Sequence, residues 1–375
     1  MDPSQNISGA RSVLLLNSSH GRFTVGSSPW VRATMDALDA LNPDQDILLT
    51  SIGLPGWELP AYRAAQMGFR QKLILPGHDN GAGAHYYQRW QDNLGLNASL
   101  TEPIFTATGN SKEFNSVRDS LAFELADIVY PVSLRPGGRL DTLLGRHIAR
   151  GGLATDLYRV EYTNNNWVPR YKLDKANLNS GLNAFDSGWL THWTHSYPGP
   201  WPNETSADFY HDMLTGPDRY VRCARSTITR ILAEGVVRGS DAHMADSETT
   251  VSLTSLPPLK ALAAMCWRSR WRRWNMEPFG ITVRREALVS LGARQVSYYD
   301  KLPPQLSDSE KIFSQRRGKS TDWSTEQEWR IHGDLRLDDI DPDKIALLMY
   351  ENHWASSAPK RAGLYRAVAI TGQNS

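Results

Sequence analysis

Short, continuous runs of apolar residues recur through the first 150 residues of the chain. Such runs are typical of strands that are buried on both faces of a parallel sheet. They predict strands at 12–17, 47–51, 72–76, 104–106 and 127–132. Helical segments alternate with them: Ser28 and Pro29 are residue types that open a helix, and further helices are predicted over 58–68 and 113–126. This order predicts a doubly wound, Rossmann-like α/β domain over residues 1–150.

The predicted strands end in glycine and small polar residues. In a doubly wound sheet, ligands bind at the carboxyl ends of the strands, and the backbone amides of a Gly- or Ser-rich loop suit a phosphate group. No loop has the full spacing of a dinucleotide-binding fingerprint, so each one alone is equally explained as a tight turn. Loops of this kind after several strands favour a nucleotide-type ligand. The candidate ligand-binding residues are Ser18, Ser19, Gly26, Ser27, Gly53, Gly56, Glu58, Arg135, Gly137 and Gly138.

Several stretches of this region resemble a known group of nucleotide-binding domains. They are Gly53-Leu54-Pro55-Gly56-Trp57-Glu58, Ala61-Tyr62-Arg63-Ala64-Ala65, Gly68, Leu73-Ile74-Leu75-Pro76, Ala126-Asp127-Ile128-Val129 and Pro136-Gly137-Gly138. Together they are similar to the SLOG group of Rossmann-like domains, which includes the DprA and "lonely guy" proteins, over roughly residues 11–150. The hydrolytic members continue the last loop with a further glycine and a glutamate, where this chain has Leu140 and Asp141. The resemblance therefore implies ligand binding or sensing rather than phosphoribohydrolase activity.

Residues 151–215 are rich in asparagine, proline and glycine, which predicts a connector with little regular structure. An aromatic stretch, Trp189–His195, lies inside it. We interpret this stretch as a packed loop, and the alternative is a wall or lid of a neighbouring substrate site. His192 and His195 would share a helical face, but no Asp, Glu or Cys completes a set of ligands with them, so no metal site is predicted.

Residues 216–375 carry short strand patterns with few helices, which predicts a second, α+β domain. The strands are predicted at 219–223, 249–254, 279–283, 295–299, 328–331, 345–349 and 364–370, and the helices at 226–234 and 259–267. Glu326 and Glu328 stand one residue apart where the strand with Trp329 and Arg330 begins. Residues two apart in a strand point to one face, where like charges repel. A chain that accepts this cost often uses the pair to hold a cationic transition state, a sugar hydroxyl or a metal.

The order of these elements resembles the ADP-ribosyltransferase (ART) fold, including its DarT-like bacterial families. Those families use an Arg or His on one strand, a helix that ends near a glycine, a small hydroxyl residue on the next strand and a glutamate on a late strand. The matching positions are Arg222, the helix from Thr227 to Gly235, Ser252 and Glu328. The resemblance implies an enzyme that uses NAD as its cofactor, breaks the N-glycosidic bond of NAD and passes ADP-ribose to an acceptor.

The same resemblance implies roles for individual residues. Arg222, Ser252 and Thr254 would bind the cofactor, with Arg222 on its diphosphate or ribose. Glu328 would bond the ribose 2′-OH and stabilise the oxocarbenium ion, and Glu326 would orient or deprotonate the acceptor. The alternative is a solvated edge strand on which both glutamates pair with nearby cations. These cations are Arg316, Arg317, Lys319 and Arg330.

Arginine and tryptophan are interleaved between Trp267 and Trp274. Arginines contact phosphates and tryptophans stack on bases, which predicts contact with a nucleic acid and a nucleic-acid base as acceptor. On a helix, the tryptophans would instead share a buried face with the arginines at its flanks. The candidate nucleic-acid contacts are Arg268, Arg270, Arg272, Arg273, Arg316 and Arg317.

The composition of the chain limits the classes of function that it can have, but it does not identify one. The formal net charge is +1, so any anion-binding site must be local. The 2 cysteines form neither a metal pattern nor a disulfide framework, no stretch has the length of a membrane-spanning helix, and the first nine residues lack the apolar run of a signal peptide. These features predict a cytoplasmic, reduced protein.

Three functional hypotheses follow. The first is an ADP-ribosyltransferase, a role that the resemblance places in toxin action or phage defence. The second is a regulator that senses a nucleotide or binds nucleic acid through an inactive ART-like fold. The third is another enzyme of N-glycosidic bonds whose catalytic part is the N-terminal domain.

Overall fold

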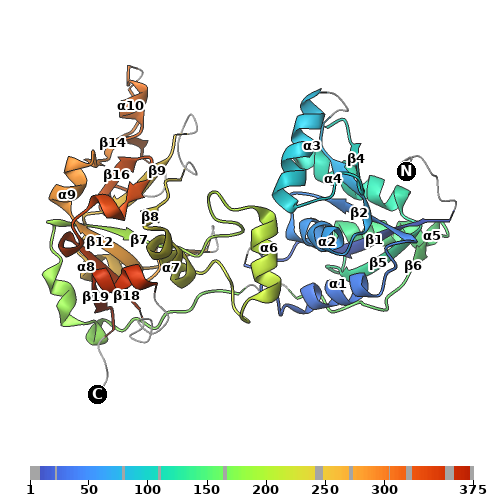
Figure 1. Cartoon of the computed structure of the whole chain (residues 1–375), viewed down its shortest axis with the longest axis horizontal. Helices are drawn as coiled ribbons and strands as arrows, with labels where there is room; N and C mark the ends of the chain where they lie inside the picture. The colour runs from blue at the N-terminus through green and yellow to red at the C-terminus, as the bar shows by residue number, and fades with distance from the viewer. Residues whose placement is uncertain are drawn as a thin grey trace. The chain divides into compact units, whose positions relative to one another are not determined.

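The computed structural model describes residues 9–21, 23–77, 81–108, 111–163, 167–240, 248–269, 273–303, 305–317, 323–350 and 359–371. The chain divides into two compact units (Figure 1). Unit 1 comprises Met1–Trp167 and Pro198–Val221, and unit 2 comprises Val168–Tyr197 and Arg222–Ser375. The predicted connector, 151–215, is therefore shared between the two units. Within the described residues, no helix is both long and apolar enough to cross a membrane.

Unit 1 is built on a six-stranded sheet in the order β4-β3-β2-β1-β5-β6, with every pair parallel. Its strands are β1 (Arg11–Asn17), β2 (Asp46–Ser51), β3 (Arg70–Leu75), β4 (Thr101–Phe105), β5 (Ile128–Ser133) and β6 (Leu153–Ala154). Its helices are α1 (Pro29–Asp39), α2 (Pro55–Gln66), α3 (Gly81–Leu94), α4 (Ser111–Leu125), α5 (Arg139–Ala149) and α6 (Ser206–Thr215). The alternation of parallel strands and helices confirms the predicted Rossmann-like α/β class.

The central strand of this sheet is β1, which pairs with β2 on one side and β5 on the other. From β1 the chain moves outward through β2, β3 and β4, and β5 then returns to the opposite side of β1. Residues 13–16 are almost completely buried, as a strand covered on both faces requires. The carboxyl ends of β1 and β5 consequently form the switch point of strand order, where open α/β sheets bind their ligands.

Three helices of unit 1 were not predicted from the sequence. Of the residues of α3, only Gly83 and Leu94 are buried, so this helix has no apolar stripe to reveal its period. α5 is amphipathic, but it begins directly after Gly138, in the loop whose residues were predicted to bind a ligand. α6 lies inside the predicted connector, where Thr205 and Asp208 form a capping box at its start.

Unit 2 is built on a seven-stranded mixed sheet in the order β13-β16-β9-β7-β12-β18-β19. Its strands are β7 (Trp189–Trp193), β9 (Thr250–Thr254), β12 (Phe279–Arg284), β13 (Arg294–Gln295), β16 (Glu328–His332), β18 (Ile345–Met349) and β19 (Arg366–Ala369). Neighbouring strands are antiparallel except for β18 and β19. The helices are α7 (Ala224–Glu234), α8 (Pro258–Ala263), α9 (Arg285–Ser290) and α10 (Asp308–Lys311).

Smaller elements complete unit 2. The two-stranded pairs are β8 (Val236–Val237) with β17 (Leu335–Arg336), β10 (Trp267–Arg268) with β11 (Arg273–Trp274), and β14 (Ser297–Tyr299) with β15 (Ser314–Arg316). The 3₁₀ turns are η1 (Lys175–Asn177), η2 (Ser180–Ala184), η3 (Trp323–Glu326), η4 (Leu337–Asp339), η5 (Pro342–Lys344) and η7 (Lys360–Leu364). The polar site described below lies where β16, β9 and the pair β14–β15 meet.

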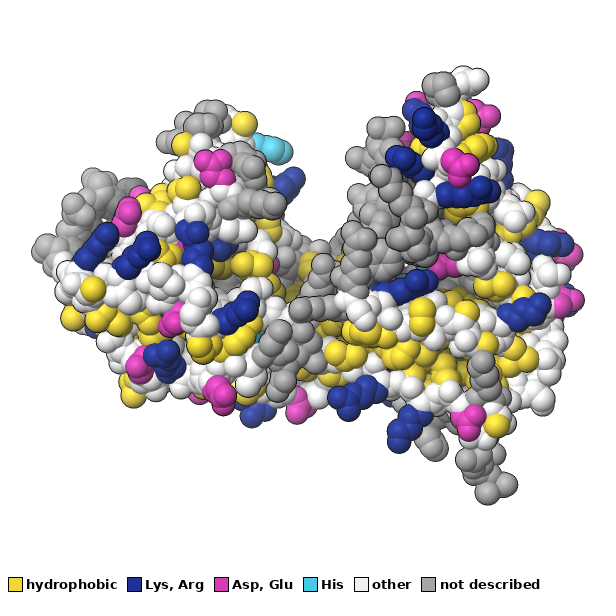
Figure 2. Space-filling model, turned by 180° about the vertical axis from the view of Figure 1, so that it is seen from behind, with side chains coloured by type: hydrophobic (Ala, Val, Ile, Leu, Met, Phe, Trp, Pro, Cys, Tyr) yellow, Lys and Arg dark blue, Asp and Glu magenta, His cyan; other side chains and the backbone are white. Residues whose placement is uncertain are grey.

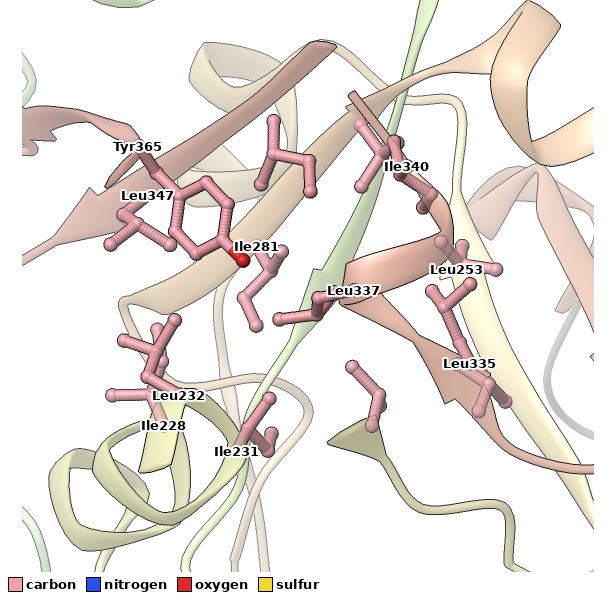
Figure 3. Close-up of a cluster of buried hydrophobic side chains, with 14 of the residues drawn as sticks. Ile228, Ile231, Leu232, Leu253, Ile281, Leu335, Leu337, Ile340, Leu347 and Tyr365 are labelled. Atoms are coloured by element: carbon pink, nitrogen blue, oxygen red, sulfur yellow. The ribbon is translucent and has the colours of Figure 1, made fainter. Parts of the chain in front are cut away.

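A large hydrophobic cluster covers one face of the unit 2 sheet (Figure 3). Side chains from α7, including Ile228 and Leu232, pack there with Leu253 and Ile281 of the sheet. Because side chains alternate along a strand, the neighbours of Leu253, namely Ser252 and Thr254, point to the opposite face. The core therefore dictates which residues of β9 are available for polar chemistry.

Several predictions about residues 189–274 were wrong. Residues 219–223 form no strand; they are bends and turns that lead into α7, which begins at Ala224 rather than at residue 226. The aromatic stretch Trp189–His195 is not a loop, because most of it is β7, a central strand of the sheet. The helix predicted over 259–267 ends at Ala263, and Trp267 and Trp274 belong to a β-hairpin.

Candidate functional site

The candidate site is centred on the carboxylate of Glu328, the first residue of β16. In the antiparallel pairing with β9, Glu328 lies opposite Thr254, and Arg330 lies opposite Ser252. These residues share the sheet face that the hydrophobic cluster does not cover. The Ser252 hydroxyl donates a hydrogen bond to Oε1 of Glu328 at 2.9 Å. The structure thus brings together the predicted hydroxyl residue and the predicted glutamate.

Arg330 holds the same carboxylate from the other side. Its Nε donates to Oε1 of Glu328 at 2.8 Å and its Nη2 donates to Oε2 at 3.2 Å. The guanidinium also donates to the carbonyl oxygen of Ile312 at 2.9 Å and to Oε1 of Gln315. Arg330 is 4% exposed, so this is a buried, two-pronged ion pair of the geometry that arginine favours with carboxylates.

Tyr298 of β14 supplies the fourth donor, from its hydroxyl to Oε2 of Glu328 at 3.3 Å. Burial, and next the negative charge of Glu328, raises the pKa of Tyr298, so its hydroxyl keeps the proton that it donates. Each carboxylate oxygen of Glu328 therefore accepts two hydrogen bonds. This number fills the lone-pair positions of a carboxylate, so the side chain of Glu328 is held in one position.

Glu326 was expected beside Glu328 on one strand, and this placement was wrong. It ends the turn η3, and Gln327 between the two glutamates has a left-handed backbone with φ of 47°. A residue other than glycine in that region costs about 1–3 kcal/mol and occurs preferentially at functional sites. The bend is held by β9, because the Thr254 hydroxyl donates to the carbonyl of Glu326 at 2.5 Å and Ser255 N donates to that of Gln327 at 3.1 Å.

The two glutamates differ in environment although they remain electrostatically coupled. The pKa of Glu326 is raised, first by burial and then by the charge of Glu328. Its one opposing influence is Arg268, whose Nη2 lies 3.8 Å from Oε1 of Glu326. The site therefore raises the proton affinity of Glu326, whereas Glu328 is engaged by four hydrogen bonds. Two neighbouring carboxyl groups with different partners can divide a proton-transfer role and a charge-stabilising role between them.

His192 of β7 and His195, which follows that strand, are both neutral near pH 7. Nδ1 of His192 lies 2.9 Å from the carbonyl oxygen of Ser252, so that nitrogen carries the proton and donates. Burial lowers the pKa of His192. Burial, then the charges of Arg273 and His192, lowers the pKa of His195 to about 3. Neither imidazole therefore adds a positive charge near pH 7, and no group of metal-binding side chains is found among the described residues.

The arginines that were predicted to contact nucleic acid lie on different elements of unit 2. Arg268 and Arg273 lie opposite each other in the hairpin β10–β11. Arg270 and Arg272 lie outside the described residues, as does Lys319. Arg316 ends β15, and Arg317 forms an ion pair with Asp300 at 3.4 Å. Figure 2 shows basic side chains interspersed with acidic ones on the described part of the visible face, without a continuous basic stripe.

Arg222, expected on the cofactor diphosphate, is 2% exposed. It immediately precedes the helix N-cap Cys223, and its carbonyl accepts a hydrogen bond from Tyr197 N at 2.8 Å. A guanidinium enclosed to this degree argues against direct contact between Arg222 and a ligand that enters from solvent. The burial of Arg222 has no signal in the local sequence, because it depends on neighbours that are distant in the chain.

In unit 1, the ends of β1 and β5 are joined at the switch point. Ser18 N donates to the carbonyl of Ser133 at 2.8 Å, and Arg135 N donates to the Ser18 hydroxyl at 2.8 Å. Asn17 and Ser133 face each other in the strand pairing and are almost completely buried. Oδ1 of Asn17 and Oγ of Ser133 have no hydrogen-bond partner among the residues that the structure describes. Unsatisfied polar atoms at the switch point are compatible with a polar ligand there.

Several of the other predicted ligand residues of unit 1 have structural reasons for their identity. A Cβ on Gly26 would lie 2.1 Å from the carbonyl oxygen of Met213, and one on Gly56 would lie 3.0 Å from Cβ of Asn17. Gly53 and Gly137 have positive φ, and Gly138 closes the turn after β5 with its amide on the Arg135 carbonyl at 2.9 Å. These glycines are explained by close packing and tight turns.

The polar members of the same loops are also engaged. Glu58 accepts from Gly53 N at 2.7 Å and from the Tyr210 hydroxyl at 2.9 Å, and burial raises its pKa. The hydroxyl of Ser27 donates to Asp218, and that of Ser19 to the carbonyl of His20 at 3.4 Å. Of the residues predicted to bind a ligand in unit 1, Ser18 and Arg135 form hydrogen bonds that join the strand ends at the switch point.

Sequence reasoning missed Tyr298, which had no signal because its contact with Glu328 joins strands that are distant in the chain. Arg330 was named in the alternative interpretation as a partner of the glutamates, and its ion pair with Glu328 is found in the structure. The pair is buried, however, and not on a solvated edge strand, because β16 lies between β13 and β9. Comparison with protein-family models, curated proteins and solved structures finds no match to this chain.

Proposed function

We propose that unit 2 is an NAD-dependent ADP-ribosyltransferase whose reaction takes place at Glu328 and Glu326. The observation that carries the proposal is the fixed carboxylate of Glu328, which Ser252 and Arg330 hold together on the sheet face opposite the large hydrophobic cluster. It is supported by the neighbouring carboxyl group of Glu326, whose raised pKa suits a proton-transfer role.

In the proposed reaction, the bond between C1′ of the nicotinamide ribose and the ring nitrogen of nicotinamide breaks first. Both electrons of that bond leave with nicotinamide, and positive charge develops on the ribose ring. The Glu328 carboxylate stabilises this charge, as carboxylates do in glycoside cleavage. The Tyr298 contact of 3.3 Å is the longest of its four hydrogen bonds, and it is the contact that a ribose hydroxyl would replace.

Glu326 completes the reaction by accepting a proton. The acceptor, a nucleic-acid base or water, attacks C1′ through a nitrogen or oxygen atom and loses a proton as the new bond forms. An ionised Glu326 takes up that proton and later releases it to solvent. In this scheme the charge of Glu328 does not change during turnover, whereas that of Glu326 does.

Release of nicotinamide from NAD tests the proposal, with and without single- or double-stranded DNA and RNA. Glu328→Gln should abolish release, and Ser252→Ala should slow it about tenfold or more, because it removes one hydrogen bond to a charged group. The matched control is Glu286→Gln, which changes an exposed glutamate of α9 and should act like the parent. Equal release by the parent and Glu328→Gln would refute the assignment.

A second candidate function has an observation of its own. All the lone-pair positions of Glu328 are filled by donors of the protein, as in a purely structural ion pair. On this basis unit 2 would bind a nucleotide without converting it, and the chain would act as a regulator. NAD binding that persists in Glu328→Gln, together with no nicotinamide release by the parent, would favour this function.

For unit 1 we propose binding of a nucleotide-type ligand at the switch point of the sheet. It is supported by the unsatisfied polar atoms of Asn17 and Ser133 and by Arg135 beside them. A screen of nucleotides by thermal shift tests it, with Ser133→Ala as the variant that should lose the shift. A ligand shift that is unchanged in Ser133→Ala would place the ligand elsewhere.

A further inference from the structure

Gln327 has a left-handed backbone between the two glutamates of the candidate site. Its φ is 47°, and among the described residues other than glycine only Ala107 and Asn203 share a positive φ. Glutamine is not one of the residue types, such as glycine and asparagine, that adopt this conformation at small cost. Left-handed residues of other types persist where the surrounding structure enforces them, and they concentrate at functional sites. The conformation of Gln327 must therefore be enforced by its neighbours.

The end of β9 enforces this conformation through hydrogen bonds on both sides of Gln327. The Thr254 hydroxyl donates to the carbonyl of Glu326 at 2.5 Å, and it accepts from Leu256 N at 3.0 Å, so its orientation is fixed. Ser255 N donates to the carbonyl of Gln327, and the Ser255 hydroxyl donates to Oε1 of the same residue, both at 3.1 Å. Ser255 is almost completely buried, so water competes poorly for these bonds.

The bend at Gln327 changes the direction of the Glu326 side chain. β16 begins at Glu328, which lies opposite Thr254 of β9. In a strand that continued regularly, Glu326 would point to the same face as Glu328. The left-handed residue instead connects the strand to η3, which ends at Glu326, in the way that a bulge at a strand end re-aims a side chain. Because two residues of chain span at most about 7 Å, the bend decides the separation of two groups that must stay close.

We propose that Gln327 is a positioning residue for this pair of carboxyl groups. Its left-handed backbone, held by the end of β9, sets where the carboxyl group of Glu326 lies beside that of Glu328. The catalytic consequence rests on the proposed function of unit 2, in which Glu328 stabilises the ribose cation and Glu326 accepts a proton from the acceptor. Both groups must then reach one bound substrate, and a displacement of about 1 Å is enough to slow such a reaction. Thr254, which was predicted to bind the cofactor, would act instead through the backbone of Glu326.

Two substitutions of Gln327 separate its backbone conformation from its side-chain contact. Gln327→Gly permits a φ of 47° without steric cost, whereas Gln327→Val strongly disfavours it because the side chain is branched at Cβ. Both remove the bond from the Ser255 hydroxyl to Oε1 of Gln327. Gln327→Val should therefore displace Glu326, and Gln327→Gly should leave it in place. The matched control is Ala107→Gly, which relaxes a left-handed residue of unit 1 and should act like the parent.

Thr254 provides an independent pair of variants. Thr254→Val keeps the shape of the side chain and removes the hydroxyl that holds the carbonyl of Glu326, whereas Thr254→Ser keeps the hydroxyl. Thr254→Val should displace Glu326, and Thr254→Ser should restore its position.

Two quantities are measured on the full chain. The first is the pKa of the Glu326 carboxyl group, by NMR titration of protein labelled with ¹³C in the glutamate side chains, with Glu326→Gln to identify the resonance. In both valine variants this raised pKa should fall towards that of an ordinary glutamate, because the displaced group loses burial. The second is NAD turnover, with water and with single-stranded DNA as acceptors. In the valine variants kcat should fall about tenfold to hundredfold with little change in KM, and the glycine and serine variants should keep most of the parent's kcat.

The outcomes separate this inference from the proposed function. Equal pKa and equal kcat in Gln327→Val and Gln327→Gly would overturn the positioning role, even if the parent turns NAD over. A pKa of Glu326 that falls in both valine variants but not in Gln327→Gly and Thr254→Ser would support the positioning role. If the parent then shows no NAD turnover, the transferase activity is refuted and the positioning role stands. Thermal unfolding of every variant is recorded, and if one valine variant does not fold, the other pair decides.

Discussion

The buried pair of Glu328 and Arg330 gives a sharp stability prediction, tested by Arg330→Met. The substitution keeps an unbranched side chain but removes two hydrogen bonds to Glu328, one to Ile312 and one to Gln315. It leaves the carboxylate of Glu328 with Ser252 and Tyr298 alone. Because the Arg330 side chain is 5% exposed and that of Glu328 16% exposed, solvent cannot replace the lost partner freely. Breaking a buried pair in this way costs about 3–5 kcal/mol of unfolding free energy.

A double-mutant cycle distinguishes this pairing from general packing. Glu328→Gln alone leaves Arg330 without its anion, and the double variant Arg330→Met with Glu328→Gln leaves neither charge unpaired. The double variant should therefore be more stable than the sum of the single effects predicts, by about 2–3 kcal/mol. Urea unfolding followed by tryptophan fluorescence measures these differences, analysed for the transition of unit 2.

The control for this cycle is Arg336→Met, on an exposed residue of β17, which should change the unfolding free energy by no more than about 0.5 kcal/mol. Losses below about 1 kcal/mol in Arg330→Met, or strict additivity in the cycle, would refute the buried-pair interpretation. In that case Glu328 would be held chiefly by Ser252.

Three further predictions concern Glu326, His195 and Gly26. Because the pKa of Glu326 is raised and its ionised form is the base, transfer of ADP-ribose to the acceptor should increase with pH through that raised pKa. Glu326→Gln should transfer ADP-ribose slowly and lack this limb in a pH–rate profile. The pKa of His195 is lowered to about 3, so His195 stays neutral in the folded protein, whereas the unfolded chain binds a proton below about pH 6.5. The free energy of unfolding should therefore fall as the pH drops from about 6.5 towards about 3. His195→Gln should reduce this slope in acid-unfolding curves, and an unchanged slope would contradict the assignment. Gly26→Ala places a Cβ 2.1 Å from the Met213 carbonyl oxygen and should cost about 1–3 kcal/mol in urea unfolding, whereas a neutral effect would show that this contact relaxes.

The sheet of unit 1 was predictable because its signal is local. A strand covered on both faces needs a continuous apolar run, and the strands β1, β2 and β3 each have one. The helix α3 escaped because it buries little, so its residues carry no apolar stripe. The glycines after the strands suggested a ligand site. The structure shows that Gly26 and Gly56 are instead required by close packing against other parts of unit 1, which cannot be read from the local sequence.

In the site of unit 2, only those features could be predicted that follow from the spacing of residues within one strand. Two separate strand patterns placed Ser252 and Glu328 each on a strand, which is confirmed, but that these strands are neighbours was not contained in the patterns and is shown by their pairing. The bend at Gln327 could not be predicted, because a residue of this type rarely has a left-handed backbone and does so here under bonds from β9. Trp267 and Trp274 fit a helical face by spacing, yet they pair across a hairpin.

The most direct test of the central claim is nicotinamide release from NAD by the parent protein and by Glu328→Gln, followed by chromatography. We predict release by the parent, none above background by Glu328→Gln, and parental release by Glu286→Gln. Dependence of that release on one nucleic acid would identify the class of acceptor. No release by the parent with NAD alone or with any DNA or RNA would contradict the claim that unit 2 is an ADP-ribosyltransferase.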